Sequence, residues 1–267
     1  MPHFAMVVLV VIASLCKAAS ALDCEPQKSE LAELNQAIII RDREDARHYQ
    51  LVKDNGTERV RNYLEGQILQ QLRTDSFPQP TNIELRIRCV QSAVPQYEIG
   101  RKDGSTNMPV AFLLSGDKPT VAVGFEIYRG GAGAPDIRPY FAVFQKRDHE
   151  WTLSGEVGSS FTQRTFFVHP IKAGRPGESW FLLWGKRIGD SGARLRVAIA
   201  AYNGTSLREI WSVDGLTGTQ VTGIFGDHII LEGEVTNQKG RAEDFRERFD
   251  VVPEGLKLVK REIMKSY

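Results

Sequence analysis

Five glutamates between residues 126 and 234 are the first candidates for acid–base chemistry in this chain. Hydrolysis of a glycosidic bond uses two carboxyl groups that face each other across the sugar. One sequence gives no separation between carboxylates on different strands, so the pattern neither excludes nor supports this chemistry. The candidates by residue type are Glu126, Glu156, Glu209, Glu232 and Glu234.

A serine motif is the second candidate. The segment Gly189-Asp190-Ser191-Gly192 matches the nucleophile motif of trypsin-like serine proteases. That mechanism needs a histidine base held by a buried aspartate, yet Ala193 stands where that family has a further glycine and no Ala-Ala-His-Cys segment precedes the motif. Because Asp and Gly are typical turn residues, we interpret the segment as a hairpin turn.

A glycine-rich run at residues 130–135 invites comparison with phosphate-binding loops. Such loops use the N-terminus of the helix that follows them. Here Pro135 and Pro139 frame the next residues and no helical pattern follows. The run is therefore predicted to be a flexible loop, with no cofactor implied.

The histidines after the N-terminal segment follow no metal-ligand spacing such as His-Glu-x-x-His. They are His48, His149, His169 and His228. Contiguous residues on a strand or turn point in different directions, so Asp148-His149-Glu150 is predicted to be a solvated hairpin tip. The sequence predicts no metal site.

The first 21 residues have the features of a signal peptide. An apolar run ends near Cys16 and is followed by Ala19-Ser20-Ala21, a pattern that signal peptidases cleave. The apolar run is shorter than the ~20 residues that span a bilayer. We therefore expect a periplasmic or extracellular protein that begins at Leu22 and has no membrane segment after cleavage.

Cleavage would leave Cys24 and Cys89 as the only cysteines. An even pair in an oxidising compartment favours a disulfide, so we predict a Cys24–Cys89 bond. Removing Lys17 with the signal lowers the formal charge from +1 to 0. Since the remaining basic residues alternate with apolar ones and are balanced by acids, nucleic-acid binding is not expected.

The N-terminal part of the mature chain is predicted to be a helical hairpin. Apolar residues recur every three or four positions over residues 29–52 and again over 58–73, where Val60, Leu64, Ile68 and Leu72 form one stripe. The segment 54–56, Asp-Asn-Gly, is expected to separate the two helices. Two prolines within residues 77–80 are expected to end the second one.

From residue 82 onward, short runs rich in Val, Ile, Phe and Leu alternate with turn residues, which is typical of strands. No helical pattern interrupts them, so the strands are predicted to be antiparallel rather than part of a βαβ fold. We expect domains at 22–80 (helical hairpin) and 81–267 (antiparallel β). The predicted strands are 83–90, 110–114, 120–128, 140–145, 151–157, 164–169, 180–186, 195–202, 207–213, 221–225, 229–235, 245–252 and 256–261.

A hairpin motif recurs in this region. Asn203-Gly204 between two β-rich runs predicts a type I′ turn, and similar hairpins are predicted after residue 144 and around residue 253. A period of about 50–60 residues in an all-β region is typical of four-stranded units. Propeller-blade-like repeats, a sandwich and an open meander are all consistent with this pattern.

The sequence thus predicts a mainly β protein with an N-terminal helical hairpin. We expect a secreted, non-catalytic domain that binds a protein or a glycan, because no convergent nucleophile, base or metal set is visible. The alternative is an exported hydrolase, carbohydrate-directed, with an acidic pair on the β-domain. A shallow aromatic face would favour the first, and two facing carboxylates in a cleft the second.

Overall fold

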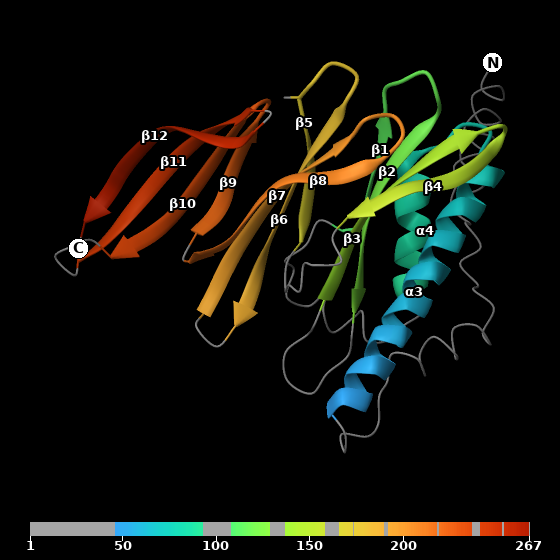
Figure 1. Ribbon diagram of the computed structural model, residues 1–267, viewed down its shortest axis with the longest axis horizontal. Coiled ribbons are helices and arrows are strands. Elements are labelled where there is room, and N and C mark those ends of the chain that lie inside the picture. The colour runs from blue at the N-terminus through green and yellow to red at the C-terminus, as the bar shows by residue number, and fades with distance from the viewer. Residues whose placement is uncertain are drawn as a thin grey trace, which may run out of the picture.

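The computed structural model describes most of the chain from residue 46 onward, as two helices followed by twelve strands (Figure 1). The described residues are 46–92, 108–128, 137–157, 166–172, 174–189, 192–217, 219–236, 241–252 and 254–266. No helix among them is long and apolar enough to cross a membrane. The predicted signal peptide and Cys24 lie outside the described residues.

The helices are α3 (Ala46–Thr74) and α4 (Pro80–Ser92). They form a hairpin, but the predicted break at residues 54–56 is wrong, because α3 runs through it; residues 29–45 of the first predicted helix lie outside the described residues. A glycine inside a helix costs about 1 kcal/mol, and burial of the stripe on the later turns of α3 outweighs that cost. The predicted stripe is confirmed, since Val60, Leu64 and Ile68 are all buried.

The strand predicted over residues 83–90 is wrong, because these residues lie in α4. Ile83, Leu85 and Ile87 alternate as in a strand, yet Ile83, Ile87 and Val90 also have helical spacing. Pro80 suits the first turn of a helix, and Leu85 is exposed while the helical set is buried. Burial of the helical set therefore selects the helix.

The remaining twelve predicted strands are confirmed, all antiparallel. Their bounds are β1 (Val110–Leu114), β2 (Thr120–Tyr128), β3 (Ile137–Arg147), β4 (Glu150–Val157), β5 (Phe167–Ile171), β6 (Ser179–Gly189), β7 (Gly192–Tyr202), β8 (Leu207–Thr217), β9 (Thr219–Phe225), β10 (His228–Thr236), β11 (Ala242–Val252) and β12 (Gly255–Ser266).

The strands form three four-stranded sheets in chain order, β1–β4, β5–β8 and β9–β12. Within each sheet, every strand pairs with its neighbours along the chain, so each sheet is a meander. Figure 1 shows the helices against the first sheet and the other two sheets following in a row away from them. The molecule is thus a stack of four layers, one helical and three of sheet.

Three apolar clusters join the layers. The first packs both helices on one face of β1–β4. The second fills the space between the first two sheets, where the rings of Phe141 and Phe181 lie 4.6 Å apart. The third joins the second and third sheets through Leu182, Ile229 and Leu231. Each inner sheet is therefore buried on both faces, which explains its near-continuous apolar strands.

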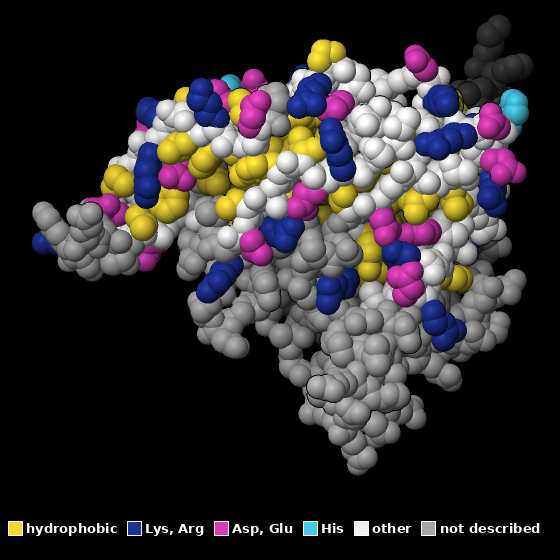
Figure 2. All heavy atoms as spheres, in the orientation of Figure 1, with side chains coloured by type: hydrophobic (Ala, Val, Ile, Leu, Met, Phe, Trp, Pro, Cys, Tyr) yellow, Lys and Arg dark blue, Asp and Glu magenta, His cyan; other side chains and the backbone are white. Residues whose placement is uncertain are grey.

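The last sheet ends the stack with a charged face. Side chains alternate along a strand, so the neighbours of Ile229 and Leu231 in sequence point away from the second sheet. Across this outer face Arg246 pairs with Glu232 at 2.5 Å, and Lys260 pairs with Glu262. Figure 2 shows hydrophobic side chains interspersed with charged ones on the side of the molecule that it displays.

A polar pocket between the first two sheets

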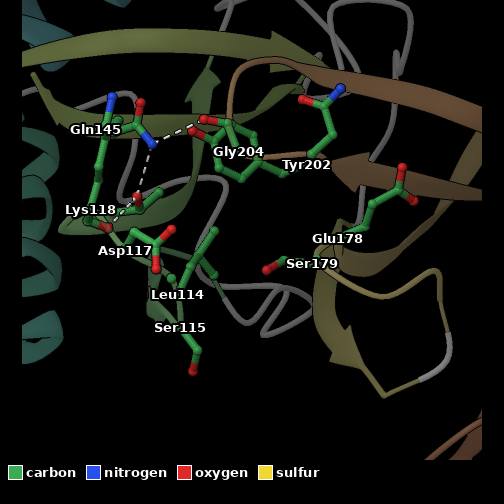
Figure 3. Close-up of a pocket in the computed structure, with 13 residues that line it drawn as sticks. Leu114, Ser115, Asp117, Lys118, Gln145, Glu178, Ser179, Tyr202 and Gly204 are labelled. Atoms are coloured by element: carbon green, nitrogen blue, oxygen red, sulfur yellow. Dashed lines mark hydrogen bonds between the residues drawn. The ribbon is translucent and has the colours of Figure 1, made fainter.

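Three turns, one from β1–β2, one before β6 and one from β7–β8, surround a pocket of about 590 Å³. The pocket lies where the ends of the first and second sheets meet (Figure 3). Almost all of its side chains carry a hydroxyl, an amide or a charge. The lining residues are Leu114, Ser115, Gly116, Asp117, Lys118, Thr120, Gln145, Gly177, Glu178, Ser179, Tyr202, Asn203 and Gly204.

Gln145 of β3 fixes one wall of the pocket. Its side chain is buried, and its Nε2 donates to the carbonyl oxygen of Gly204 at 3.1 Å and to Oγ1 of Thr120 at 3.4 Å. Arg147 donates in turn to Gln145 Oε1 at 2.9 Å and to the Thr205 carbonyl at 3.2 Å. These bonds connect the first sheet to the β7–β8 turn, so this wall is preorganised.

The β7–β8 turn supplies the adjoining wall. The predicted hairpin is confirmed, but four residues, 203–206, connect the strands instead of two. Asn203 Oδ1 accepts from the backbone N–H groups of Thr205 at 3.1 Å and Ser206 at 2.9 Å, and Gly204 alone adopts a positive φ of 87°. The side chain of Asn203 stabilises this wider turn.

Tyr202 lies at the end of β7 with its ring directed toward Gln145 in Figure 3. The residue is 4% exposed, and its hydroxyl is buried with no hydrogen-bond partner among the described residues. An unsatisfied buried hydroxyl costs about 1–3 kcal/mol. Such a group beside a polar pocket is a place where a bound hydroxyl or water could supply the missing hydrogen bond.

Two carboxylates lie on opposite sides of the pocket, Asp117 from the β1–β2 turn and Glu178 from the turn before β6 (Figure 3). Glu178 is held in place, since its Oε2 accepts from Trp180 Nε1 at 2.8 Å and Arg208 Nη2 lies 3.9 Å from its Oε1. Asp117 is exposed. The pocket therefore has one fixed and one solvated carboxylate.

A second, less polar groove of about 780 Å³ adjoins the pocket. The two share Leu114, Ser115 and the turn at 177–179. Phe112, Pro170 and other apolar residues line the far side of the groove. A ligand in the polar pocket could thus extend along the inner edges of the first two sheets.

The carboxylates singled out in the sequence do not meet in this pocket. Glu126 is buried on β2, and Glu156 pairs with Arg61 of α3. Glu209 pairs with Arg196, Glu232 pairs with Arg246, and Glu234 is exposed on β10.

The serine motif and the glycine-rich run give no site among the described residues. Gly189 pairs with Gly192, which confirms a hairpin there, while residues 190–191 and 130–135 lie outside the described residues. Within the part of the chain that is described, no group of three metal-ligating side chains occurs.

The histidines lie apart from one another. His149 sits at an exposed hairpin tip with a φ of 73°, as predicted, and His169 is exposed on β5. His228 Nδ1 lies 2.7 Å from Asp250 Oδ1. His48 lies in α3, in the part of that helix where the structure describes the backbone only.

Cys89 lies on α4, not on a strand, and is buried and disulfide-bonded. Because Cys24 lies outside the described residues, the pairing of these two cysteines stays a prediction.

The residues that form the pocket were not singled out from the sequence. Asp117, Gln145, Glu178 and Tyr202 come from different turns and strands, and only the packing of two sheets brings them together. The available signal was indirect: Glu178 follows Pro176-Gly177, and Asp117 follows Gly116, as expected of polar turns. Comparison with known protein families and with curated proteins finds no match for this chain.

Proposed function

We propose that this chain is a non-catalytic binding protein that holds a hydroxyl-rich ligand, a carbohydrate, in the polar pocket between its first two sheets. The observation that supports this best is the lining, which combines hydroxyls, amides and backbone carbonyls on a preorganised frame. A sugar presents many donors and acceptors at short spacing. An apolar ligand would leave these lining groups unpaired, at a cost in affinity.

A blocking substitution tests the proposal. Ser115 is exposed at the pocket, so Ser115→Trp should fill the space without disturbing a strand. Gln220→Trp, at an exposed position on β9 in the third sheet, is the matched control. On an array of neutral oligosaccharides followed by calorimetry, we expect wild-type protein and Q220W to bind alike and S115W to lose at least tenfold in affinity. Equal binding by S115W, or no binding by wild type, would contradict the proposal.

The second candidate is a carbohydrate hydrolase, and one observation favours it. Asp117 and Glu178 line the same pocket on opposite sides (Figure 3), and glycosidases use two carboxyl groups that flank the sugar. Incubating the bound oligosaccharides with the protein and separating the products tests this. Release of shorter products by wild type and not by D117N or E178Q would support the enzyme, and intact oligosaccharides would support the binder.

Export and a Cys24–Cys89 disulfide are part of the same proposal. They rest on the signal-peptide pattern at residues 1–21 and on the even pair of cysteines in the mature chain. We also propose that the sheets are blade-like repeats of a propeller type, which the chain order of the strands and the face-to-face stacking support. The three units among the described residues are fewer than the ~4–8 blades of closed propellers.

A further inference from the structure

A cluster of charged side chains lies between α3 and the first sheet, apart from the polar pocket. Arg61 of α3 is at its centre, with Nη1 only 2.6 Å from Glu156 Oε1 on β4. Arg61 also pairs with Glu58 one helical turn earlier, and its Nε lies 3.6 Å from Glu65 Oε1 one turn later. One guanidinium thus serves three carboxyl groups, and its bond to Glu156 joins the helix to the sheet.

Two oxygens in this cluster lack a donor. Glu65 Oε1 and Glu156 Oε2 are buried, and while both carboxyl groups are ionised neither oxygen accepts a hydrogen bond from a described residue. Ionised carboxylates only accept hydrogen bonds. A proton on Glu65, shared with Glu156, supplies a donor between the two elements.

The surroundings of Glu65 stabilise the protonated form of its carboxyl group. Burial raises the pKa of Glu65 to about 7, against the lowering effect of Arg61, and the charge of Glu156 and its hydrogen bond to Glu65 raise it further. On the sheet side, Tyr140 of β3 also faces the cluster, with Arg138 nearby; burial raises the pKa of the Tyr140 phenol. The Tyr140 phenol is therefore neutral near pH 7, when Glu65 titrates.

We infer that the contact between α3 and β4 is a proton-linked latch, closed while Glu65 and Glu156 share a proton and loosened when that proton leaves. With the proton bound, Glu65 is a neutral donor and Arg61 is free to neutralise Glu156. Once Glu65 ionises, three carboxylates surround Arg61, and the repulsion acts across the interface between α3 and β4.

The latch acts on one helix. Contacts without Glu65 hold α4 to the sheet: Glu84 Oε1 accepts from the Ala111 N–H at 2.9 Å, and Gln91 Nε2 donates to the Glu126 carbonyl at 3.2 Å. Loss of the proton should therefore loosen α3 and β4 while α4 stays in place.

Hydrogen–deuterium exchange of the full chain at pH 6 and pH 8 tests the latch, with exchange times scaled for the intrinsic effect of pH. We expect about tenfold lower protection at pH 8 in peptides from α3 and β4, and equal protection at both pH values in β10 and β11. E65Q keeps a neutral donor at residue 65. Its α3 and β4 peptides should therefore be as protected at pH 8 as at pH 6. E58Q is the matched control, because Glu58 pairs with the same Arg61 but is exposed, and it should keep the pH dependence.

Equal scaled protection of wild-type α3 and β4 at both pH values would overturn the inference, as would an unchanged pH dependence in E65Q. If E65Q does not fold, carboxyl-detected NMR of the wild type decides instead. A midpoint for Glu65 near pH 7 supports the latch, and a midpoint near 4.5 overturns it. None of these readouts involves the polar pocket, so the latch and the proposed function can fail independently.

Discussion

Residue 65 shows how burial sets the protonation state of a single side chain. Its carboxyl group is about 14% exposed, and Glu156 lies beside it. The folded chain therefore holds a proton that the unfolded chain releases at lower pH. Linkage then makes the free energy of unfolding fall as pH rises from about 4.5 to about 7, and level off above that range.

We predict that E65Q loses this part of the pH dependence. Each pKa unit corresponds to about 1.4 kcal/mol, and solvent screening reduces the expected fall in wild type to about 2 kcal/mol over the window. Urea unfolding at half-unit pH steps measures the fall. A wild-type curve parallel to that of E65Q between pH 4.5 and 7 would show that Glu65 titrates normally.

Tyr202 leads to a prediction in which stability and binding change in opposite directions. Removing a buried hydroxyl that has no partner should stabilise the free protein, by about 0.5–1 kcal/mol. The same Y202F change should weaken binding of a ligand that reaches the hydroxyl. Thermal unfolding of Y202F measures the change in stability, and calorimetry on the same sample measures the change in affinity. Destabilisation of the unliganded protein would mean that the hydroxyl already has a partner.

Gly255 stands where no other residue fits. Its φ is 128°, and a Cβ at this position would overlap the Trp211 ring of the second sheet. Gly255→Ala should lower the free energy of unfolding by about 3 kcal/mol or more, from backbone strain and displacement of the indole. Gly226→Ala is the control, since it has positive φ but open space, and it should cost about 1 kcal/mol. Equal costs in urea unfolding would argue against the contact.

At the scale of elements, α3 contains an exposed glycine with no structural task. Nothing lies within 4 Å of a Cβ placed on Gly66. Gly66→Ala should therefore stabilise the protein by about 0.5–1 kcal/mol, because alanine loses less backbone entropy in a helix. The shift of the urea midpoint measures it. A lower midpoint would mean that the helix surface at residue 66 is covered by another part of the chain.

Strands were the elements that the sequence predicted best. Alternation and turn residues placed twelve of them correctly, since each is bounded by local signals such as Asp148-His149 or Asn203-Gly204. The apolar residues in 83–90 fit both the two-residue period of a strand and the 3.6-residue period of a helix. Only the position of the first sheet decides which of these apolar residues are buried. The continuity of α3 across Gly56 likewise depends on packing, which local propensity does not report.

At the scale of the whole molecule, the grouping into four-stranded units was visible as a repeat, but the pocket was not. Gln145 and Gly204 are 59 residues apart in the chain and meet only because the first two sheets stack face to face. The charged cluster at Arg61 depends in the same way on how α3 lies on β4, 95 residues further on. A site formed between two layers cannot be located from the sequence until it is known which layers pack together and through which faces.

The chain order of the three sheets also bears on how the protein is made. Every strand pairs only with a neighbour along the chain, so each meander closes short loops, and closing short loops costs little entropy. A ribosome delivers the chain from its N-terminus, and the first sheet with its helices can form while the third is still being synthesised. Each completed sheet then offers an apolar face as a template for the next. The outer face of β9–β12 carries charged pairs such as Arg246–Glu232, and so it differs from the apolar faces on which the earlier sheets pack.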